Sequence, residues 1–181
     1  MKTELKMYDN SWYRPAGRIK SLVWYYTNVF FLINKLIPLS SIKVAILKIF
    51  GASIGKGVVI KPGVNIKYPW FLTIGDYSWI GEDVWIDNLT EVKIGSNCCI
   101  SQGAMLLCGN HNFKKSTFDL IVKPITLEDG VWIGAKTTVC PGVTAKSHSV
   151  LTVGSILSQD MEPYTIYRGN PATSVKKRII E

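Results

Sequence analysis

The sequence has little of what metal sites and disulfide frameworks require. Its four cysteines include no C-x-x-C pair, and two of them are adjacent. This spacing suits neither a zinc ribbon nor a disulfide framework. The 181 residues contain only two histidines. We therefore expect no metal ion, and we expect the cysteines to be small, buried apolar residues in a reducing compartment.

The N-terminus also lacks the features of a secretion signal. Residues 1–13 are charged and polar, and no apolar stretch with a small-residue cleavage site follows them. The most apolar stretch, residues 22–37, is sixteen residues long and contains Asn28, Asn34 and Lys35. A bilayer span needs ~20 mostly apolar residues. We therefore expect a cytoplasmic protein.

The composition is that of about one globular domain, with 47% hydrophobic and 19% charged residues. The net charge of +8 is concentrated at the two ends: residues 1–50 hold eight Lys/Arg against two Asp/Glu, and residues 176–181 hold three against one. A nucleic-acid binder usually concentrates its basic residues on one folded face, so we expect no nucleic acid. The basic ends are expected to meet a phosphate-bearing cofactor or a membrane surface.

The first fifty residues are predicted to be helical. Apolar residues at spacings of three and four indicate a helix with one apolar side, namely Ile19, Leu22, Val23, Tyr26, Phe30, Ile33 and Ile37. A second short amphipathic run ends at Gly51. We interpret residues 1–50 as a helical cap on the domain. The aromatic residues with flanking Lys and Arg also suit a helix in a membrane interface, so peripheral contact with the inner membrane stays open as an alternative.

From residue 54 onward the apolar residues recur with a period of six. They include Ile54, Ile60, Ile66, Ile74, Ile80, Ile86, Ile94, Ile100, Leu106, Leu127, Ile133, Val139, Ala145 and Leu151. Each interruption of the period falls after three repeats, so one coil contains three short strands and has the shape of a triangle. We predict an all-β solenoid, a parallel β-helix of about five triangular coils over residues 51–168.

This repeat resembles the hexapeptide acyltransferases, whose fold is the left-handed parallel β-helix. The handedness follows from the resemblance alone, since the general rule for parallel crossovers predicts the opposite. Residues 107–177 resemble the sugar O-acetyltransferases of exopolysaccharide synthesis, of the colanic-acid type, through "GNHNF", "STFDLIVKPITLEDGVWIG", "PGVT", "GSILSQD" and "YRGNPATSVKKR". Galactoside, maltose and streptogramin acetyltransferases are more distantly similar. The resemblance implies acetyl transfer from acetyl-CoA to a sugar hydroxyl by a bacterial homotrimer.

The largest interruption, from Leu106 to Leu127, predicts an extruded loop over residues 107–124 that contains His111. A loop of this length is usually functional, and a neutral imidazole is a suitable general base for an alcohol. By resemblance, His111 is that base and the backbone N–H of Ala135 stabilises the oxyanion. Asn112 follows the histidine where relatives often have Asp, so Asp119 and Asp87 are both candidates for an assisting carboxylate. We interpret His148 as a surface residue.

The resemblance also implies substrate-binding residues. Asn88, Asp87 and Trp85 are the candidates for holding the acceptor, a sugar or a lipid-linked glycan, although an ordinary Asp-Asn turn explains Asn88 equally well. The expected coenzyme A track contains Trp132, Ala135, Val153, Gly154, Ser155 and Ser158. A C-terminal basic tail, residues 169–181, follows the solenoid. We expect the nearby Arg168, Lys176, Lys177 and Arg178 to surround a turn and bind phosphate.

Three other functions share the predicted architecture. A γ-type carbonic anhydrase needs three histidines for zinc, and this chain has two. An acyltransferase that uses another donor, such as an acyl carrier protein, is generally longer and has a helical C-terminal domain. A non-catalytic scaffold would explain the repeat, but it gives the long loop and the basic tail no function.

Overall fold

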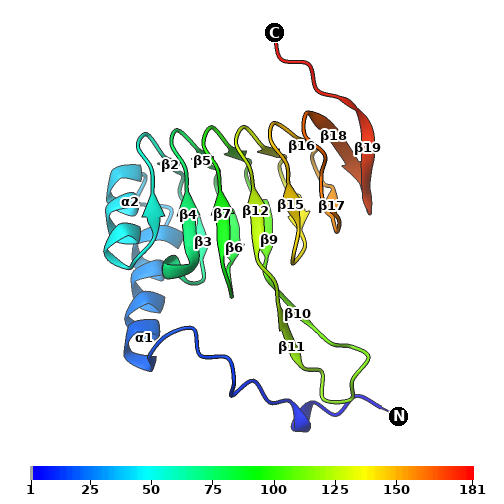
Figure 1. Ribbon diagram of the computed structural model, residues 1–181. Helices are drawn as coiled ribbons and strands as arrows, with labels where there is room; N and C mark the ends of the chain where they lie inside the picture. Colours follow the sequence, from blue (N-terminus) through cyan, green and yellow to red (C-terminus); the bar gives the residue numbers. More distant parts are fainter. Residues whose placement is uncertain (1) are drawn as a thin grey trace.

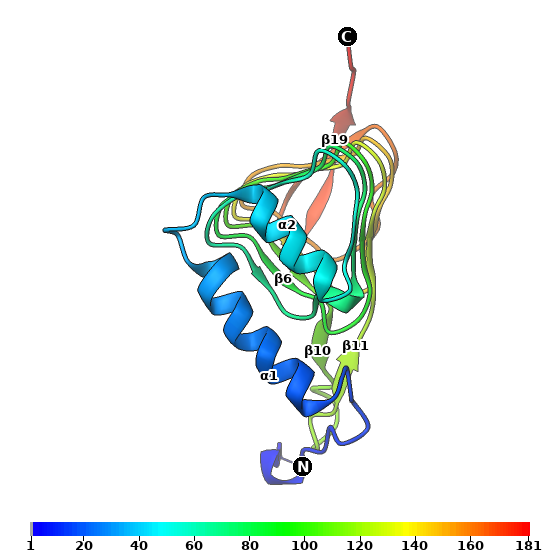
Figure 2. The same ribbon diagram turned by 90° about the vertical axis from the view of Figure 1, so that its left-hand side faces the viewer.

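The six-residue repeat folds as three stacks of short parallel strands, which form the sides of a triangular prism (Figures 1 and 2). The structure is a computed structural model that describes residues 2–181. The predicted all-β parallel solenoid is confirmed. It has about six turns, one more than expected, because one face is continued by a sixth parallel strand, Thr165–Gly169.

We number the three faces in chain order. The first face contains β1 (Ser53–Ile54), β4 (Leu72–Ile74), β7 (Val92–Ile94), β12 (Ile125–Leu127) and β15 (Thr144–Ala145). The second contains β2 (Val59–Ile60), β5 (Trp79–Ile80), β8 (Cys99–Ile100), β13 (Trp132–Ile133), β16 (Val150–Leu151) and β18 (Thr165–Gly169), and ends in the antiparallel strand β19 (Ala172–Lys177). The third contains β3 (Asn65–Ile66), β6 (Trp85–Asp87), β9 (Met105–Leu107), β14 (Thr138–Val139) and β17 (Ile156–Leu157).

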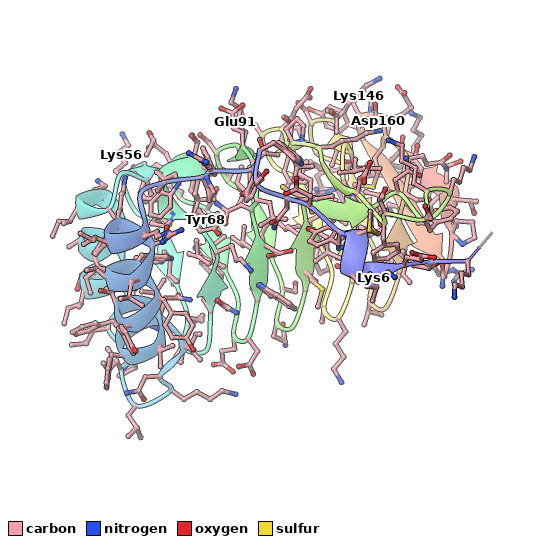
Figure 3. All side chains as sticks on the ribbon, turned by 90° about the horizontal axis from the view of Figure 1, so that it is seen from below. Lys6, Lys56, Tyr68, Glu91, Lys146 and Asp160 are labelled. Carbon is pink, nitrogen blue, oxygen red and sulfur yellow. The ribbon has the colours of Figure 1, made fainter. Side chains whose placement is uncertain are left out.

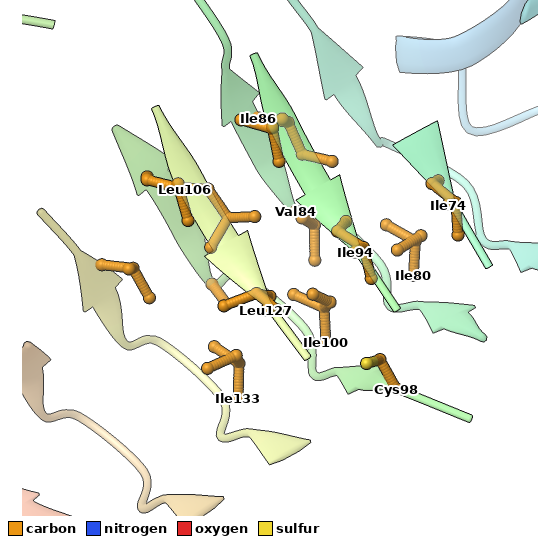
Figure 4. Close-up of a cluster of buried hydrophobic side chains, with 14 of the residues drawn as sticks. Ile74, Ile80, Val84, Ile86, Ile94, Cys98, Ile100, Leu106, Leu127 and Ile133 are labelled. Atoms are coloured by element: carbon orange, nitrogen blue, oxygen red, sulfur yellow. The ribbon is translucent and has the colours of Figure 1, made fainter. Parts of the chain in front are cut away.

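The prism interior is filled by the periodic aliphatic residues. Ile80, Ile86 and Ile100 are fully buried, and Figure 4 shows them packed against the equivalent residues of neighbouring coils. Burying one such side chain contributes about 1.5–3 kcal/mol. Equivalent residues of successive coils are joined by backbone hydrogen bonds, such as Gly55 N–H to the Ile74 carbonyl at 2.8 Å. The six-residue period therefore identifies the core correctly.

Glycine follows the buried aliphatic residue in several repeats because the next coil lies too close for a side chain. A Cβ on Gly75 would lie 2.6 Å from the Ser96 nitrogen, and one on Gly134 would lie 2.6 Å from the Leu151 oxygen. Real Cβ atoms essentially never approach other heavy atoms this closely. These glycines therefore permit close stacking of the coils.

The N-terminal helices bury a different side from the one predicted. They are α1 (Arg18–Thr27), its π-helical continuation η2 (Asn28–Ile33) and α2 (Ser40–Ile49). The buried residues of the first helix are Trp24, Asn28 and Leu32, whereas most of the predicted apolar stripe is exposed. Trp24 Nε1 donates to the Ile66 carbonyl at 3.0 Å, and Asn28 Nδ2 donates to Asn65 Oδ1 at 2.8 Å. The helix therefore packs on the first coil through the side that can form hydrogen bonds with the Ile66 carbonyl and the Asn65 side chain.

The helix α2 lies across the open end of the prism (Figure 2). Its Leu47 is fully buried, and so is Lys43. The Lys43 Nζ donates to the Lys61 carbonyl at 2.9 Å, and burial lowers the pKa of its ammonium group. Among residues 2–181, no helix is both long and apolar enough to cross a membrane.

The segment before α1 runs alongside the solenoid rather than joining the cap. It includes a short 3-10 helix, η1 (Leu5–Met7). The other 3-10 helix of the described residues, η3 (Pro69–Phe71), lies in the solenoid, directly before β4. Figure 3 shows the N-terminal segment passing along the body of the molecule as far as Lys6. The Glu4 N–H donates to the Ser116 carbonyl at 2.9 Å. The interpretation of residues 1–50 as one helical cap therefore applies only to its helices.

Candidate active site

The long interruption of the repeat forms an antiparallel hairpin, not an irregular loop. Its strands are β10 (Gly109–His111) and β11 (Leu120–Val122), with His111 opposite Leu120. The hairpin leaves the prism after β9, at the corner between the third and first faces, and extends well beyond the coils (Figure 1). The backbone pairing gives His111 a defined position at the end of a strand.

The imidazole of His111 is fixed by Phe118 on the opposite side of the hairpin. Its Nδ1 lies 2.9 Å from the Phe118 carbonyl oxygen, and the two rings stack at 4.3 Å between centroids with an interplanar angle of 7°. The ring of Tyr8 packs edge-on at 5.5 Å. A carbonyl can only accept, so this contact assigns the proton to Nδ1 and leaves the Nε2 lone pair available. The hairpin thus presents an oriented base.

Neither candidate carboxylate is the partner of Nδ1. Asp119 forms an ion pair with Lys115 at 2.8 Å, and the hydrogen bond from this lysine lowers the pKa of the Asp119 carboxyl. Asn112 donates its backbone N–H to the Asp119 carbonyl at 2.8 Å. The position that an assisting carboxylate would take is occupied by the Phe118 carbonyl oxygen.

Asp87 instead lies at the base of the hairpin among aromatic and thiol groups. Its Oδ1 is buried and accepts no hydrogen bond within residues 2–181, and Lys67 Nζ is 3.7 Å away. Burial, with a further contribution from the Asp87 charge, raises the pKa of the Tyr13 and Tyr68 hydroxyls and raises that of the Cys108 thiol to about 12. Because Oδ1 is buried beside Lys67, the oxygen of Asp87 that can accept a hydrogen bond from a sugar hydroxyl is Oδ2.

Asn88 does not have the geometry expected of an acceptor-binding residue. It is fully buried, its Nδ2 donates to the Tyr68 carbonyl at 2.6 Å, and its Oδ1 accepts the Tyr68 N–H at 3.0 Å. Both ends of the amide are therefore used to bridge two coils. The side chain of Asn88 thus pairs backbone groups of Tyr68 that lack a ladder partner, which favours a structural role for this residue over acceptor binding.

Trp85 lies on the same strand as Asp87 and is partly exposed. It lines a hollow of about 320 Å³ together with Tyr25, Lys67 and Tyr68. The indole is available on the outside of the third face, next to the helix α1. Of the three expected acceptor residues, Asp87 and Trp85 therefore lie two positions apart on the same strand, β6.

The expected oxyanion donor lies at another corner of the prism. Ala135 follows β13 at the corner between the second and third faces, whereas the hairpin leaves the corner between the third and first faces. Within residues 2–181, no hydrogen bond uses the N–H of Gln102, Ala135 or Val153, which occupy this corner on successive coils. One chain therefore holds a base and a row of free N–H donors at opposite edges of its third face.

The expected coenzyme A track is only partly continuous. Trp132 is exposed on the second face and donates Nε1 to Ser101 Oγ at 2.9 Å, and Val153 and Gly154 are exposed at the corner with Ala135. Ser155 is buried, and its Oγ accepts the Gly169 N–H at 3.0 Å. Ser158 follows β17 and lies at the next corner. The side chains of these two serines therefore do not lie on the exposed corner that Ala135, Val153 and Gly154 share.

The four cations expected around one turn are separated. The C-terminal tail forms β19, antiparallel to β18, and only Arg168 adjoins the turn between them. Lys176 pairs with Ile166 along the strand, while Lys177 Nζ donates to Thr165 Oγ1 at 2.9 Å. Arg178 Nη1 donates to the Gly130 and His148 carbonyls at 3.0 and 3.1 Å. Lys177 and Arg178 thus fasten the end of the tail to the other edge of the second face.

His148 is half-buried at a corner, and its ring lies 4.7 Å from that of Tyr164. Within residues 2–181, no group of three or more His, Cys, Asp or Glu side chains is placed to hold a metal ion.

Sequence reasoning missed the aromatic groups that surround the base. Tyr8 contacts His111 across 103 positions of sequence, and no repeat or motif signals this contact. Tyr13 donates its hydroxyl to the Leu89 carbonyl and so attaches the N-terminal segment beside Asp87. The "STF" phrase contains Phe118, but its spacing from His111 becomes meaningful only once the hairpin register is known.

Comparisons with known proteins agree with this geometry. No family model matches the chain. A protein of Escherichia coli (strain K12) described as a colanic acid biosynthesis acetyltransferase, WcaF, is 39% identical over 134 residues, which cover 74% of each chain. The hexapeptide-repeat acetyltransferase VCA0836 of Vibrio cholerae superposes with a TM-score of 0.73 at 25% identity, over 77% of this chain and 81% of that one.

A galactoside acetyltransferase in complex with coenzyme A shares the fold, with a TM-score of 0.77 at 23% identity over 88% of this chain and 80% of that one. The prism is therefore the left-handed parallel β-helix. The identity with WcaF, its coverage and the shared repeat show that the chain belongs to the hexapeptide-repeat acetyltransferases, in the group that includes the colanic acid biosynthesis enzyme.

Proposed function

We propose that this acetyltransferase transfers the acetyl group of acetyl-CoA to a hydroxyl of a sugar in exopolysaccharide or capsule synthesis, with His111 as the general base. The observation that carries the proposal is the contact between His111 Nδ1 and the Phe118 carbonyl oxygen at 2.9 Å. It orients the ring with Nε2 free to accept a proton.

In the proposed reaction the acceptor oxygen attacks the acetyl carbon directly. A C–O bond forms, the C–S bond breaks, and the hydroxyl proton passes through Nε2 to the departing sulfur. A positioned base typically contributes 10²–10⁴-fold to such a step. The Oδ2 of Asp87, the carboxylate oxygen that is not buried beside Lys67, would accept a hydrogen bond from the acceptor, and Trp85 would contact a sugar face.

The donor would bind along the corner that contains Ala135. Trp132, Val153 and Gly154 are exposed there, and Arg168 lies on the last coil. The free N–H of Ala135 is the proposed donor to the oxyanion. These groups can be brought to His111 only by a neighbouring copy, because one chain holds them at opposite edges of its third face. We therefore propose a homotrimer with the active site between subunits, in the cytoplasm where acetyl-CoA is available.

The test is the release of free coenzyme A from acetyl-CoA in the presence of a panel of mono- and oligosaccharides. Acetyltransferase activity requires thiol release that depends on both the protein and a sugar, with the acetyl group recovered on a sugar oxygen. A scaffold would release none, and an enzyme with another acyl donor would release thiol only from that donor. Sedimentation equilibrium at three times the chain mass is the expected oligomeric result.

A further inference from the structure

A cleft of about 820 Å³ opens between the N-terminal segment and the first helix. Its lining includes Arg14, Arg18, Tyr13, Ser21, Tyr25 and Tyr68. None of these residues was part of the expected site. The cleft shares Ser21, Tyr25 and Tyr68 with the smaller hollow that contains Trp85. The two hollows therefore adjoin each other, and we refer to them together as the depression beside the third face.

The outer end of this depression is strongly basic. Arg14 donates Nε to the Ser11 carbonyl at 3.3 Å. Neither Arg14 nor Arg18 takes part in any of the six ion pairs formed by residues 2–181. The carboxylate nearest in sequence, Asp9, accepts the N–H of Ser11 at 2.8 Å. Two guanidinium groups without a carboxylate partner thus line the same cleft.

The surrounding sequence provides no counter-charge. Between Asp9 and Asp76 there is no Asp or Glu, whereas this stretch contains nine Lys and Arg residues. Positive potential is therefore concentrated at this end of the molecule. Planar guanidinium groups with several N–H donors match the oxygens of a phosphate, which they bind by charge-assisted hydrogen bonds.

The inner end of the depression leads toward the candidate active site. Tyr13 and Tyr68 line the cleft, and both are close enough to Asp87 for its charge to raise the pKa of their hydroxyls. Asp87 in turn lies near Gly109, the first residue of the strand that ends at His111. A ligand bound in the depression would have its anionic end at the arginines and its hydroxyls near the carboxylate.

We propose that the cleft binds the phosphate or diphosphate group of the acceptor, so that the acetylated sugar is part of a phosphorylated glycan. The inference rests on the proposed acetyl transfer, for which it names the acceptor class. The same chemistry occurs in two sources, a soluble sugar phosphate and a glycan carried on a lipid phosphate. The exposed apolar side of α1 and its continuation η2, with Ile19 and Leu22 on α1 and Phe30 on η2, adjoins the cleft and is suited to the lipid source.

The test uses inorganic pyrophosphate as the probe and the full-length chain saturated with coenzyme A, so that the phosphate site of the donor is already occupied. Binding is measured by isothermal titration calorimetry for the parent, for Arg14→Gln/Arg18→Gln, and for a charge-matched control, Lys56→Gln/Lys93→Gln. The control lysines are exposed and lie outside both hollows. We expect one site per chain, at least tenfold weaker binding in the arginine variant, and less than a twofold change in the control.

Absence of pyrophosphate binding to the parent, or an equal loss in both variants, would overturn the inference. The coenzyme A affinity of all three proteins is measured in the same series. Failure of the parent to bind coenzyme A would count against the proposed function, whereas normal coenzyme A binding with no pyrophosphate site would count against the inference alone.

A second arm identifies the source of the phosphate. The parent and a Leu22→Ser/Phe30→Ser variant are sedimented with vesicles of phosphatidylglycerol and, separately, of phosphatidylcholine. Sedimentation of the parent with the anionic vesicles only, lost in the variant, supports a lipid-linked glycan. Pyrophosphate binding without sedimentation supports a soluble sugar phosphate and overturns the lipid source.

Discussion

Phe118 holds His111 by two contacts at once: its carbonyl oxygen lies 2.9 Å from Nδ1, and its ring stacks on the imidazole at 4.3 Å. Phe118 has a φ of +52°, in the left-handed region, which is uncommon for a residue other than glycine. This backbone conformation accompanies both contacts. The carbonyl of Phe118 thus fixes the tautomer of His111, and the ring of Phe118 fixes the plane of the imidazole.

Replacing Phe118 by leucine should separate these two effects. The variant Phe118→Leu keeps the carbonyl but loses ring stacking, which is worth about 0.5–1.5 kcal/mol. We expect kcat to fall about two- to tenfold, with KM for acetyl-CoA unchanged, and we expect Phe118→Tyr to restore kcat. The matched control is Phe113→Leu, because Phe113 is exposed on the same hairpin. Equal kcat values for Phe118→Leu and the parent would contradict an orienting role of the ring.

The amide of Asn88 should contribute to stability rather than to acceptor binding. Asn88→Ala leaves the N–H and the carbonyl of Tyr68 unpaired, at a cost of about 1–3 kcal/mol for each buried group. We expect a lower free energy of unfolding, measured by urea denaturation. KM for the acceptor should stay unchanged at a temperature where the variant is folded. A stable variant with a raised KM would restore Asn88 to the acceptor site.

Arg168 and Arg178 should respond differently to substitution. Arg178→Met removes two charge-assisted hydrogen bonds to the carbonyls of Gly130 and His148. We expect it to lower stability by about 1.5–3 kcal/mol and to leave coenzyme A affinity unchanged. Arg168→Met should weaken coenzyme A binding severalfold with little effect on stability. A loss of coenzyme A affinity in the Arg178 variant would show that the tail cations act as one phosphate site.

Stability should decline at alkaline pH because the core contains thiols. Burial raises the pKa of Cys98 to about 11 and that of Cys108 to about 12, from an ordinary 9.0. Folding therefore favours the protonated thiols, so their contribution is complete below pH 9. It is lost at about 1.4 kcal/mol per pH unit for each thiol as the pH rises through 9 toward 11 and 12.

The measurement is the free energy of unfolding between pH 8 and 11 for the parent and for Cys108→Ala. The variant loses packing at all pH values, but its curve should decline less steeply above pH 9. Identical slopes would contradict the burial of a titrating thiol at this position.

The solenoid could be predicted from the sequence because every coil repeats the same local requirement. An aliphatic residue every sixth position fills the interior, and Ile80 and Ile100 are buried where the period places them. The extra residues between Leu106 and Leu127 likewise had to leave the prism at a corner. These features depend on spacing along the chain, which a single sequence contains.

The remaining features depend on contacts that spacing does not reveal. The helix α1 and its continuation η2 dock through Trp24 and Asn28 because the first coil offers polar partners, so their more apolar side stays exposed. Arg178 lies at the far end of a strand from Arg168 because β19 folds back on β18. Tyr8 reaches His111 only after the N-terminal segment has run along the solenoid. Each depends on the fold as a whole.

The central claim, that His111 is the base, is tested most directly by comparing His111→Ala with the parent. The measurement is the rate of sugar-dependent release of coenzyme A, with coenzyme A affinity determined on the same samples. The account predicts a rate lower by 10²–10⁴-fold, with coenzyme A affinity within twofold of the parent. A variant that releases coenzyme A at the parental rate would contradict it.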